Sequence, residues 1–367
     1  MKKLNIPFAR PTINVNRSSA LIKSVLKKNF PNEGEFTKKF ENKVSSLLKI
    51  KYAVTSTSGT SSIFLALKAI NIKSNDEVIV PNITFAATAN AVELSGAKLV
   101  LVDINKENLL IDINDLKKKI TKKTKVIIPV HVSGRGGNIL EIIKLAKSKN
   151  IKVLEDAAEA MMSKKRNSYL GTLGEVGCFS FAPNKIITTG QGGIVVTNNK
   201  KIFNNLKKLK DQGRVGITTG GEDNFSSVGY NFKFTNLQAA LGLSQLVDLK
   251  KRMKTLRENY LIYKKYLKSH KNFSLIGFNI KDGELPLWTD AHCNRRNELF
   301  NYLKKHGITG RYFWHPLNYC KPFKQSFSKL QNSKKLMKKL IWLPSSLDLK
   351  KRDIIKICKL INKFYRV

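Results

Sequence analysis

Lys185 is the residue of this sequence whose chemistry is easiest to interpret. It lies on a short polar loop between two apolar, β-like segments, residues 178–181 and 193–196, which should bury the loop. A lysine that is partly removed from water is a nucleophile for carbonyl carbons and forms Schiff bases. The simpler alternative is a solvated charge, because most lysines in so basic a chain face water. The rest of the sequence must therefore supply what a Schiff-base lysine needs.

A carboxylate follows another apolar segment. Residues 151–154 predict a buried strand, and Glu155 and Asp156 come directly after it. An apolar strand that ends in an acid presents a negative charge at the edge of a sheet, where ligands bind. The alternative is an acid in the first turn of a helix, where the helix dipole stabilises it.

Two further predicted strands end in residues suited to binding. A Ser-Gly-Thr turn follows the strand expected at residues 52–56. Ser58, Gly59 and Thr60 would open a helix there, where backbone N–H groups and hydroxyls bind anions, although an ordinary helix cap is the alternative. Phe85 follows the next expected strand and would place an aromatic ring at the same edge, unless it caps the core.

Together these positions offer an anion site, an aromatic ring, an acid and a lysine, each next to a strand end. Pyridoxal phosphate requires that combination. Its phosphate binds backbone donors, its ring stacks on an aromatic side chain, its pyridine nitrogen pairs with an acid and its aldehyde reacts with a lysine. The residues therefore predict a pyridoxal phosphate site, and no metal site is expected.

The elements that position these residues alternate between strand and helix. Short apolar strands separated by helices predict an α/β fold with an open, mostly parallel sheet that helices cover on both faces. The carboxyl ends of parallel strands meet at one edge, where ligands bind. The expected strands are 52–56, 77–80, 98–102, 125–130 and 151–154, and the expected helices are 17–28, 36–48, 61–70, 86–94 and 139–148.

The chain becomes mainly helical after the second β-like segment. A helix is expected at 201–209 and a single long helix at 237–267. The Gly-rich segment 213–231 between them is too polar for the core and too long for a simple turn, which is typical of a functional or mobile loop. A smaller α/β lobe follows and ends in an amphipathic helix. The expected division is a large cofactor-binding domain at residues 1–245, then a linking helix and a small C-terminal domain at residues 246–367.

The composition is that of a globular protein. The chain has 367 residues, of which 42% are hydrophobic and 25% charged, so it has enough apolar residues for a full core. Its formal net charge of +41 raises the alternative of a basic nucleotide- or nucleic-acid-binding protein without catalysis. The lysines are spread along the whole chain without a nucleic-acid-binding motif, so no nucleic acid is expected. A positive surface suits anionic substrates such as nucleotide diphosphates.

The cysteines and the N-terminal residues indicate where in the cell the protein is found. The 4 cysteines are widely spaced and form no CxxC pair, which predicts neither a disulfide framework nor a zinc site and fits a reducing compartment. The first residues lack the apolar core of a signal peptide, and no apolar run reaches the length of a membrane span. A cytoplasmic protein is therefore expected.

Longer motifs around these residues resemble those of the DegT/DnrJ/EryC1/StrS family of sugar-nucleotide aminotransferases, which are fold-type I pyridoxal phosphate enzymes with the aspartate aminotransferase fold. The resemblance extends over nearly the whole chain. It is most marked to the branch of GDP-perosamine synthase-like 4-aminotransferases. The motifs are PNITFAATANAVELSGA at 81–97, VLEDAAEA at 153–160, FSFAPNKIITTGQGGIVV at 179–196, YNFKFTNLQAALGLSQL at 230–246 and RYFWHPL at 311–317.

The resemblance implies a role for each matching position. Lys185 would form the Schiff base with the cofactor and, once released, move a proton between the amino donor and the cofactor. Asp156 would keep the pyridine nitrogen protonated. The other implied cofactor contacts are Phe85 on the ring, Glu159 near the ring hydroxyl, Ser58, Gly59, Thr60 and Ser180 at the phosphate, and Asn231 reaching the phosphate from the other subunit of a homodimer. The implied substrate contacts are Arg311, Trp314, His315 and the Gly-rich loop before Asn231.

The implied reaction transfers an amino group from L-glutamate to a keto-sugar nucleotide, in the synthesis of a surface polysaccharide such as the lipopolysaccharide O-antigen. A 4-keto-6-deoxy sugar is expected from the branch resemblance alone. Lysine at position 185 argues against the dehydratases of the family, which lack it, but another pyridoxal phosphate reaction on a sugar nucleotide remains the alternative. Residues 131–137, HVSGRGG, depart from the more usual His-Leu-Tyr-Gly form of the family.

Overall fold

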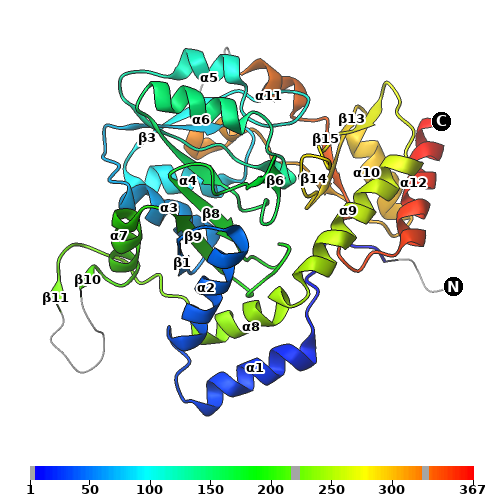
Figure 1. The fold of residues 1–367 in the computed structure, drawn as a ribbon. Helices are drawn as coiled ribbons and strands as arrows, with labels where there is room; N and C mark the ends of the chain where they lie inside the picture. The colour runs from blue at the N-terminus through cyan, green and yellow to red at the C-terminus, as the bar shows by residue number, and fades with distance from the viewer. Residues whose placement is uncertain (1–4, 216–223, 325–329) are drawn as a thin grey trace.

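The computed structural model describes residues 5–215, 224–324 and 330–367, and it is built around two main sheets (Figure 1). Within these residues the larger sheet has seven strands in the order β1-β9-β8-β5-β4-β2-β3. All are parallel to one another except β9, which pairs antiparallel with β1 and β8. The strands are β1 Tyr52–Ser56, β2 Glu77–Pro81, β3 Lys98–Val102, β4 Thr124–Ile127, β5 Lys152–Asp156, β8 Val176–Ser180 and β9 Gly193–Thr197.

Helices cover both faces of the larger sheet, because apolar side chains point to both sides of its strands. In β2, Val78 and Val80 pack on one side and Ile79 on the other. One face holds α3 Gly59–Ala69, α4 Ala86–Ser95 and α7 Lys200–Lys210, and the other holds α2 Glu35–Leu48, α5 Ile113–Lys119, α6 Ile139–Ser148 and α8 Asn236–Leu246. The predicted α/β fold with a mostly parallel, doubly covered sheet is confirmed.

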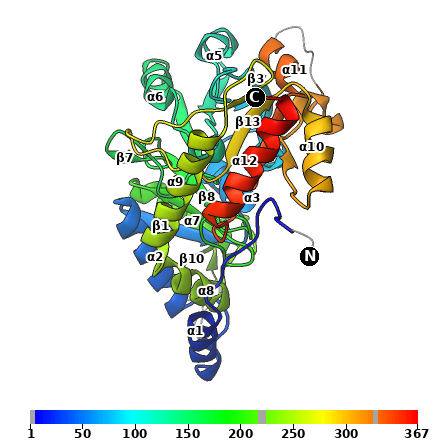
Figure 2. The same cartoon turned by 90° about the vertical axis from the view of Figure 1, so that its right-hand side faces the viewer.

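The smaller sheet is wholly antiparallel and has the order β12-β13-β15-β14. Helices α9 and α12 pack side by side near it (Figure 2). The N-terminal arm joins it, since Ile6 bridges to Ile308 and the ring of Phe8 lies 4.9 Å from that of Trp288. The division at residues 245 and 246 stays a prediction. The elements are β12 Phe273–Leu275, β13 Thr289–Cys293, β14 Arg311–Tyr312, β15 Leu340–Leu343, α9 Leu249–Tyr266, α10 Arg296–Lys305 and α12 Lys351–Tyr365.

Short elements complete the described chain. None of the helices in the described ranges combines the length and the apolar character that a bilayer crossing requires. The remaining elements are α1 Val15–Lys27, α11 Gln331–Leu336, the 3₁₀ turns η1 Val132–Gly134, η2 Leu317–Tyr319 and η3 Lys321–Phe323, and two hairpins, β6 Lys164–Lys165 with β7 Ser168–Tyr169 and β10 Arg214–Val215 with β11 Asn224–Phe225.

The single helix expected at residues 237–267 is wrong, because the chain breaks between α8 and α9. A continuous helix would join the N–H of Asp248 to the carbonyl of Ser244. Instead Arg17 of α1 donates to the Ser244 carbonyl at 3.0 Å and to the Asp248 carboxylate at 2.7 Å. The N–H of Asp248 turns to the carbonyl of Gln245. A side chain from a distant helix therefore ends α8.

Two strand ends also differ from expectation. β4 ends at Ile127 rather than at residue 130, since Pro129 has no N–H to donate to the ladder. β5 continues through Asp156 rather than ending at Leu154. Glu155 and Asp156 are thus the last two residues of the strand and do not follow it.

Candidate active site

Lys185 lies on the loop that connects β8 to β9 at the carboxyl edge of the larger sheet. Its Nζ is 3.3 Å from Oε1 of Glu159, with 16% of the lysine side chain and 8% of the glutamate side chain exposed. The backbone closes the loop through hydrogen bonds between Phe181 and both Gly192 and Thr189. The lysine is therefore a largely buried, ion-paired amine, and the alternative of a solvated charge is wrong.

Glu159 is held by two donors besides Lys185. The backbone N–H of Ser133 donates to Oε2 at 2.9 Å, and the indole N–H of Trp288 donates to Oε1 at 2.9 Å. Both carboxylate oxygens accept hydrogen bonds, so neither oxygen of this buried acid lacks a partner. The donors come from η1 and from the segment just before β13, so the acid joins parts of the chain that are far apart in sequence.

Asp156 is buried on the strand next to the one that leads to Lys185. Its Oδ2 accepts from the hydroxyl of Thr88 at 2.7 Å and its Oδ1 from the N–H of Ala158 at 3.1 Å. Burial raises the pKa of Asp156, a change that these donors and the charge of Lys185 oppose. Within the described residues Asp156 has no ion-pair partner, so a bound cation would find a free charge here.

The two neighbouring acids of β5 point to opposite faces, as strand geometry requires. Glu155 accepts from the N–H groups of Gly171 and Leu173 and pairs with Nε2 of His131 at 2.8 Å. It is a structural acid. No helix starts directly after Asp156, since residues 158–159 and 161–162 form turns, so the interpretation as a helix N-terminal acid is wrong.

The helix α3 starts at the carboxyl edge, close to the end of β8. Ser58 is its N-cap: the Ser58 hydroxyl accepts from the N–H of Ser61 in a capping box, which confirms the capping interpretation. Gly59 lies directly against Ser180, since a Cβ on Gly59 would come within 2.9 Å of the Ser180 Cβ. Thr60 makes no side-chain hydrogen bond within the described residues. The turn thus presents free backbone N–H groups beside two hydroxyls, as an anion site requires.

Phe85 is exposed at the same edge. It precedes α4 and 55% of its surface is accessible, so it does not cap the core. Its ring centroid lies 6.3 Å from that of Trp314. An exposed aromatic ring beside a buried acid is suited to stacking on a flat ligand.

The segment that carries the expected substrate contacts is anchored to the turn before Phe85. The N–H of Leu317 donates to the carbonyl of Asn82 at 2.7 Å, and the side chains of Asn82 and Asn318 are hydrogen bonded at 2.9 Å. Trp314 is therefore brought to the site. His315 follows it and is exposed.

Arg311 is also exposed, but it lies on β14 with its guanidinium 5.6 Å from the ring of Trp342. Phe313 is buried and packs on Trp342 as well, with centroids 4.3 Å apart. The lobe-packing interpretation of this segment thus holds for Phe313. Within the described chain Arg311 makes no contact with Lys185 or Asp156.

Asn231 is not part of this cluster in a single chain. It is exposed and its backbone bridges to Asp211 at the end of α7, next to the β10–β11 hairpin that protrudes from the body of the molecule (Figure 1). Residues 216–223 of the Gly-rich segment lie outside the described residues. The role of Asn231 stays a prediction.

Three contacts at the site escaped prediction from sequence. Thr88 lies one turn beyond Phe85 and donates to Asp156, and its position one turn into α4 was the available signal. Ser133 and Trp288 both hold Glu159. No local pattern marks them. Ser133 meets Glu159 because β4 and β5 are neighbouring strands, and Trp288 reaches it from the segment before β13.

The residues present fit pyridoxal phosphate. A buried carboxylate without an ion-pair partner suits a pyridinium nitrogen, and an exposed phenylalanine suits the ring. The glycine-lined helix start suits a phosphate, and a buried lysine suits an aldehyde. These features come from four separate segments of the chain and meet at one edge of the sheet.

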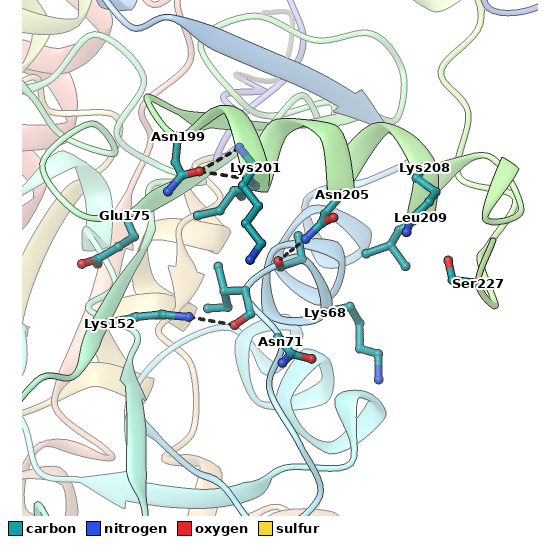
Figure 3. A pocket seen from close by; sticks show the side chains of 13 residues that line it. Lys68, Asn71, Lys152, Glu175, Asn199, Lys201, Asn205, Lys208, Leu209 and Ser227 are labelled. Atoms are coloured by element: carbon teal, nitrogen blue, oxygen red, sulfur yellow. Dashed lines mark hydrogen bonds between the residues drawn. The ribbon is translucent and has the colours of Figure 1, made fainter. Parts of the chain in front are cut away.

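A cavity of about 480 Å³ lies at the opposite edge of the larger sheet (Figure 3). Lys152 lines it and starts β5, whose other end carries Asp156. Lys152 also donates to the carbonyl of Ile70 at 2.9 Å, just beyond the C-terminal end of α3, where the helix dipole favours positive charge. This cavity is separate from the site, and no cluster of potential metal ligands occurs in the described parts of the chain.

Comparison with known proteins gives consistent matches over the whole chain. Residues 13–362 match the model of the DegT/DnrJ/EryC1/StrS aminotransferase family. The sequence is 36% identical over 337 residues to GDP-perosamine synthase of Escherichia coli O157:H7, covering 91% of each chain.

Solved structures agree with this match. Helicobacter pylori PseC, an aminotransferase involved in the biosynthesis of pseudoaminic acid, superposes with a TM-score of 0.93 at 25% identity over 99% of both chains. E. coli GDP-4-keto-6-deoxy-D-mannose-3-dehydratase with bound hydrated pyridoxal phosphate superposes with a TM-score of 0.90 at 25% identity, over 97% of this chain and 99% of that one.

The contact between Gly59 and Ser180 generates a test of the anion site. We expect Gly59→Ala to weaken the binding of pyridoxal phosphate by roughly tenfold, about 1.4 kcal/mol, because the added Cβ pushes the start of α3 away from Ser180. Fluorescence titration with the cofactor measures this. Gly277→Ala is the matched control, since its Cβ would meet nothing within 4 Å. Equal affinities in the two variants would contradict the assignment.

Proposed function

The chain belongs to the DegT/DnrJ/EryC1/StrS aminotransferase family, and from this membership we propose which substrate it takes and which residues serve it. The protein is a pyridoxal-phosphate-dependent sugar-nucleotide aminotransferase with the fold-type I architecture. We propose that it converts a 4-keto-6-deoxy sugar nucleotide to the 4-amino sugar, with L-glutamate as the amino donor, for the synthesis of a surface polysaccharide such as the O-antigen.

One observation carries the proposed site. Lys185 Nζ lies 3.3 Å from Glu159 at the sheet edge where the buried Asp156, the start of α3 and the exposed Phe85 also occur. Lys185 shares burial against a carboxylate with Lys210, whereas most other lysines of the described chain face water. Burial raises the pKa of the neighbouring Asp156, and buried ionisable groups perturbed in this way concentrate at functional sites.

Each residue assigned to the site then has a role in the reaction. When bound, the cofactor supplies a ring that accepts the electron pair left on the reacting carbon. Lys185 holds the cofactor and, through Nζ, removes and returns the proton of the reacting carbon. Asp156 keeps the ring nitrogen protonated, and the Thr88 hydroxyl orients Asp156. Glu159 is the acid near the ring hydroxyl.

The remaining assigned residues bind rather than react. Phe85 stacks on the ring, and the backbone N–H groups of the start of α3 bind the phosphate. Ser58 acts mainly by capping that helix. The phosphate contacts are Gly59, Thr60 and Ser180, and the substrate contacts are Trp314, His315 and Arg311.

The substrate class rests on similarity to GDP-perosamine synthase and on charge. A nucleotide sugar carries a diphosphate, and the net charge of +41 favours its approach. The conversion at C4 rather than C3 follows from the same relative. The proposed location is the cytoplasm, which agrees with four free cysteines in the described residues, three of them buried.

Removal of the lysine amine tests the proposal directly. Purified protein saturated with pyridoxal phosphate should show the visible absorption band of a lysine-bound cofactor, and Lys185→Ala should abolish the band and lower kcat by at least about 10³-fold. Lys201→Ala, which alters an exposed lysine at the far cavity, should leave both unchanged. A wild-type protein without the band would contradict the proposed function.

The products separate transamination from elimination on the same cofactor. With glutamate and a panel of 3-keto and 4-keto sugar nucleotides, we expect one equivalent of 2-oxoglutarate for each amino sugar formed, with nitrogen on C4. NMR of the purified sugar gives the position. Release of ammonia without an amino sugar would support the alternative reaction, and amination at C3 would overturn the assignment of the carbon.

We propose further that the active form is a homodimer in which Asn231 reaches the phosphate bound by the partner chain. Its exposure, apart from the other site residues of its own chain, supports this assignment. Asn231→Asp should be inactive because it brings a negative charge to the phosphate.

Mixing the two inactive variants tests the shared site. Co-refolding Asn231→Asp with Lys185→Ala should restore part of the activity, because the mixed dimer contains one site with both native residues. Size-exclusion chromatography confirms the dimer. If Asn231→Asp is fully active, or if mixed dimers stay inactive, the shared site is excluded.

A further inference from the structure

We propose that Ser133, Asp290 and Arg135 form a buried strut that positions Glu159 and so sets the charge felt by the nitrogen of Lys185. The inference rests on the proposed function of Lys185. It assigns positioning roles to three residues outside the predicted site, within and beyond the segment 131–137 whose sequence departs from the usual family form.

The strut starts at the carboxylate of Glu159. Ser133 donates its backbone N–H to Oε2 of Glu159 at 2.9 Å, and its hydroxyl donates to Oδ1 of Asp290 at 2.9 Å. One residue thus connects the site acid to β13 of the smaller sheet. The backbone of Ser133 has a φ of 56°, in the left-handed region that a serine adopts at some cost in free energy.

Asp290 is held in turn by Arg135. The guanidinium forms an ion pair with Oδ2 of Asp290, and both side chains are almost completely buried. Arg135 also donates to the carbonyls of Gly277 and Ile276, at 2.9 and 3.2 Å, and lies 3.9 Å above the ring of Phe278. The arginine therefore has partners on several sides and leaves Asp290 little freedom to move.

The neighbouring backbone fits this arrangement tightly. The N–H of Leu287 donates to the carbonyl of Ser133 at 3.0 Å, and a Cβ on Gly134 would come within 2.1 Å of the carbonyl oxygen of Leu285. Gly134 has a φ of 99°, which favours glycine. The turn after β4 and the segment before β13 are thus in direct contact, with the ion pair beside them.

A buried ion pair is a costly way to gain stability, since apolar side chains of similar size serve as well or better. Here the ion pair instead fixes the orientation of the Asp290 carboxylate. Asp290 accepts from the hydroxyl of Ser133, which fixes the orientation of the residue whose N–H reaches Glu159. Trp288, two residues before Asp290, donates to the other oxygen of Glu159. The segment that contains Trp288 and Asp290 therefore holds both oxygens of Glu159, one directly through Trp288 and the other through Ser133.

A fixed carboxylate matters because its natural partner moves. Lys185 must leave its resting position to transfer protons, and an unrestrained glutamate would follow the ammonium group. Glu159 stays in place because its oxygens have other donors. Its charge then favours the protonated form of the nearby nitrogen by an amount that depends on how well it is held.

The charged groups that face this pair come from three elements. Asp156 of β5 and Asp290 of β13 carry negative charges that act on Glu159, and Arg135 opposes Asp290. Burial raises the pKa of Asp290, while the charge and hydrogen bond of Arg135 and the hydroxyl of Ser133 oppose that rise. Removal of the Ser133 hydroxyl therefore disturbs Asp290 and Glu159 together.

The test follows the absorption of the lysine-bound cofactor against pH in the holoenzyme. Glu159→Gln should lower the midpoint of this titration by about one pH unit, because the nitrogen loses a negative neighbour. Ser133→Gly removes the hydroxyl, keeps the N–H that donates to Glu159 and relieves the positive φ. We expect it to fold normally and to lower the midpoint by a smaller amount.

The double variant decides whether Ser133 acts through Glu159. Its midpoint should equal that of Glu159→Gln alone, because two changes along one route are not additive. Ser163→Ala is the matched control: its buried hydroxyl bridges the Gly134 carbonyl and the Leu285 N–H in the same region but touches neither Glu159 nor Asp290. It should titrate like the wild type.

Several results would overturn the strut. A wild-type midpoint in Ser133→Gly, an additive shift in the double variant, or an equal shift in Ser163→Ala each excludes it, as does an unchanged midpoint in Glu159→Gln. If Ser133→Gly does not fold, Ser133→Ala makes the same deletion. Absence of the lysine-bound band in the wild type is a different outcome, since it contradicts the proposed function itself.

Discussion

The buried carboxylate of Glu159 joins the two halves of the molecule. Lys185 reaches it from the loop after β8, and Trp288 reaches it from the segment that enters β13. A buried charge without partners costs several kcal/mol, so the Trp288 indole and the Ser133 N–H must keep hold of Glu159 even when Lys185 moves away. The position of the smaller sheet relative to the reactive edge of the larger sheet is therefore constrained by one acid.

The order of strands in the larger sheet places Asp156 near Lys185. β5 and β8 are parallel neighbours, and Asp156 pairs in register with Cys178, so the acid lies beside the strand that leads to Lys185. The single antiparallel strand, β9, returns the chain directly from the loop that carries the lysine. Gln245 of α8 supports that loop, accepting from the N–H of Thr188 at 3.1 Å. The loop that carries Lys185 is therefore short and is held in place by hydrogen bonds to a neighbouring helix.

Charge is distributed very unevenly between the surface and the interior. The chain carries a formal charge of +41, yet the buried charges near the site are mainly acids, among them Glu155, Asp156, Glu159 and Asp290. Each has particular donors, and Arg135 and Lys185 are the cations that face them. The net charge therefore affects how anionic molecules approach this protein. The chemistry depends instead on a few buried groups, and amino-acid composition does not reveal what surrounds them.

Local sequence determined the strands, most of the helices and the kinds of residue at the strand ends. Alternation, helical spacing and the Ser-Gly-Thr turn act over a few residues, so β1, β2, α6 and the lysine loop could be predicted from them. The family motifs added the cofactor and its expected contacts. Phe85 is a case where sequence left two interpretations and the exposure of the ring decided between them.

Tertiary structure alone decided where distant segments meet. Arg17 ends α8 from a helix more than 200 positions away in the chain, which no local pattern records. β5 extends to Asp156 and turns Glu155 to the opposite face, toward His131. Trp288 reaches Glu159, and Asp290 reaches Ser133, from a segment more than 120 positions further along the chain. Sequence thus identified the candidate lysine and acid, whereas the partners that hold them depend on long-range packing, which short-range propensities do not encode.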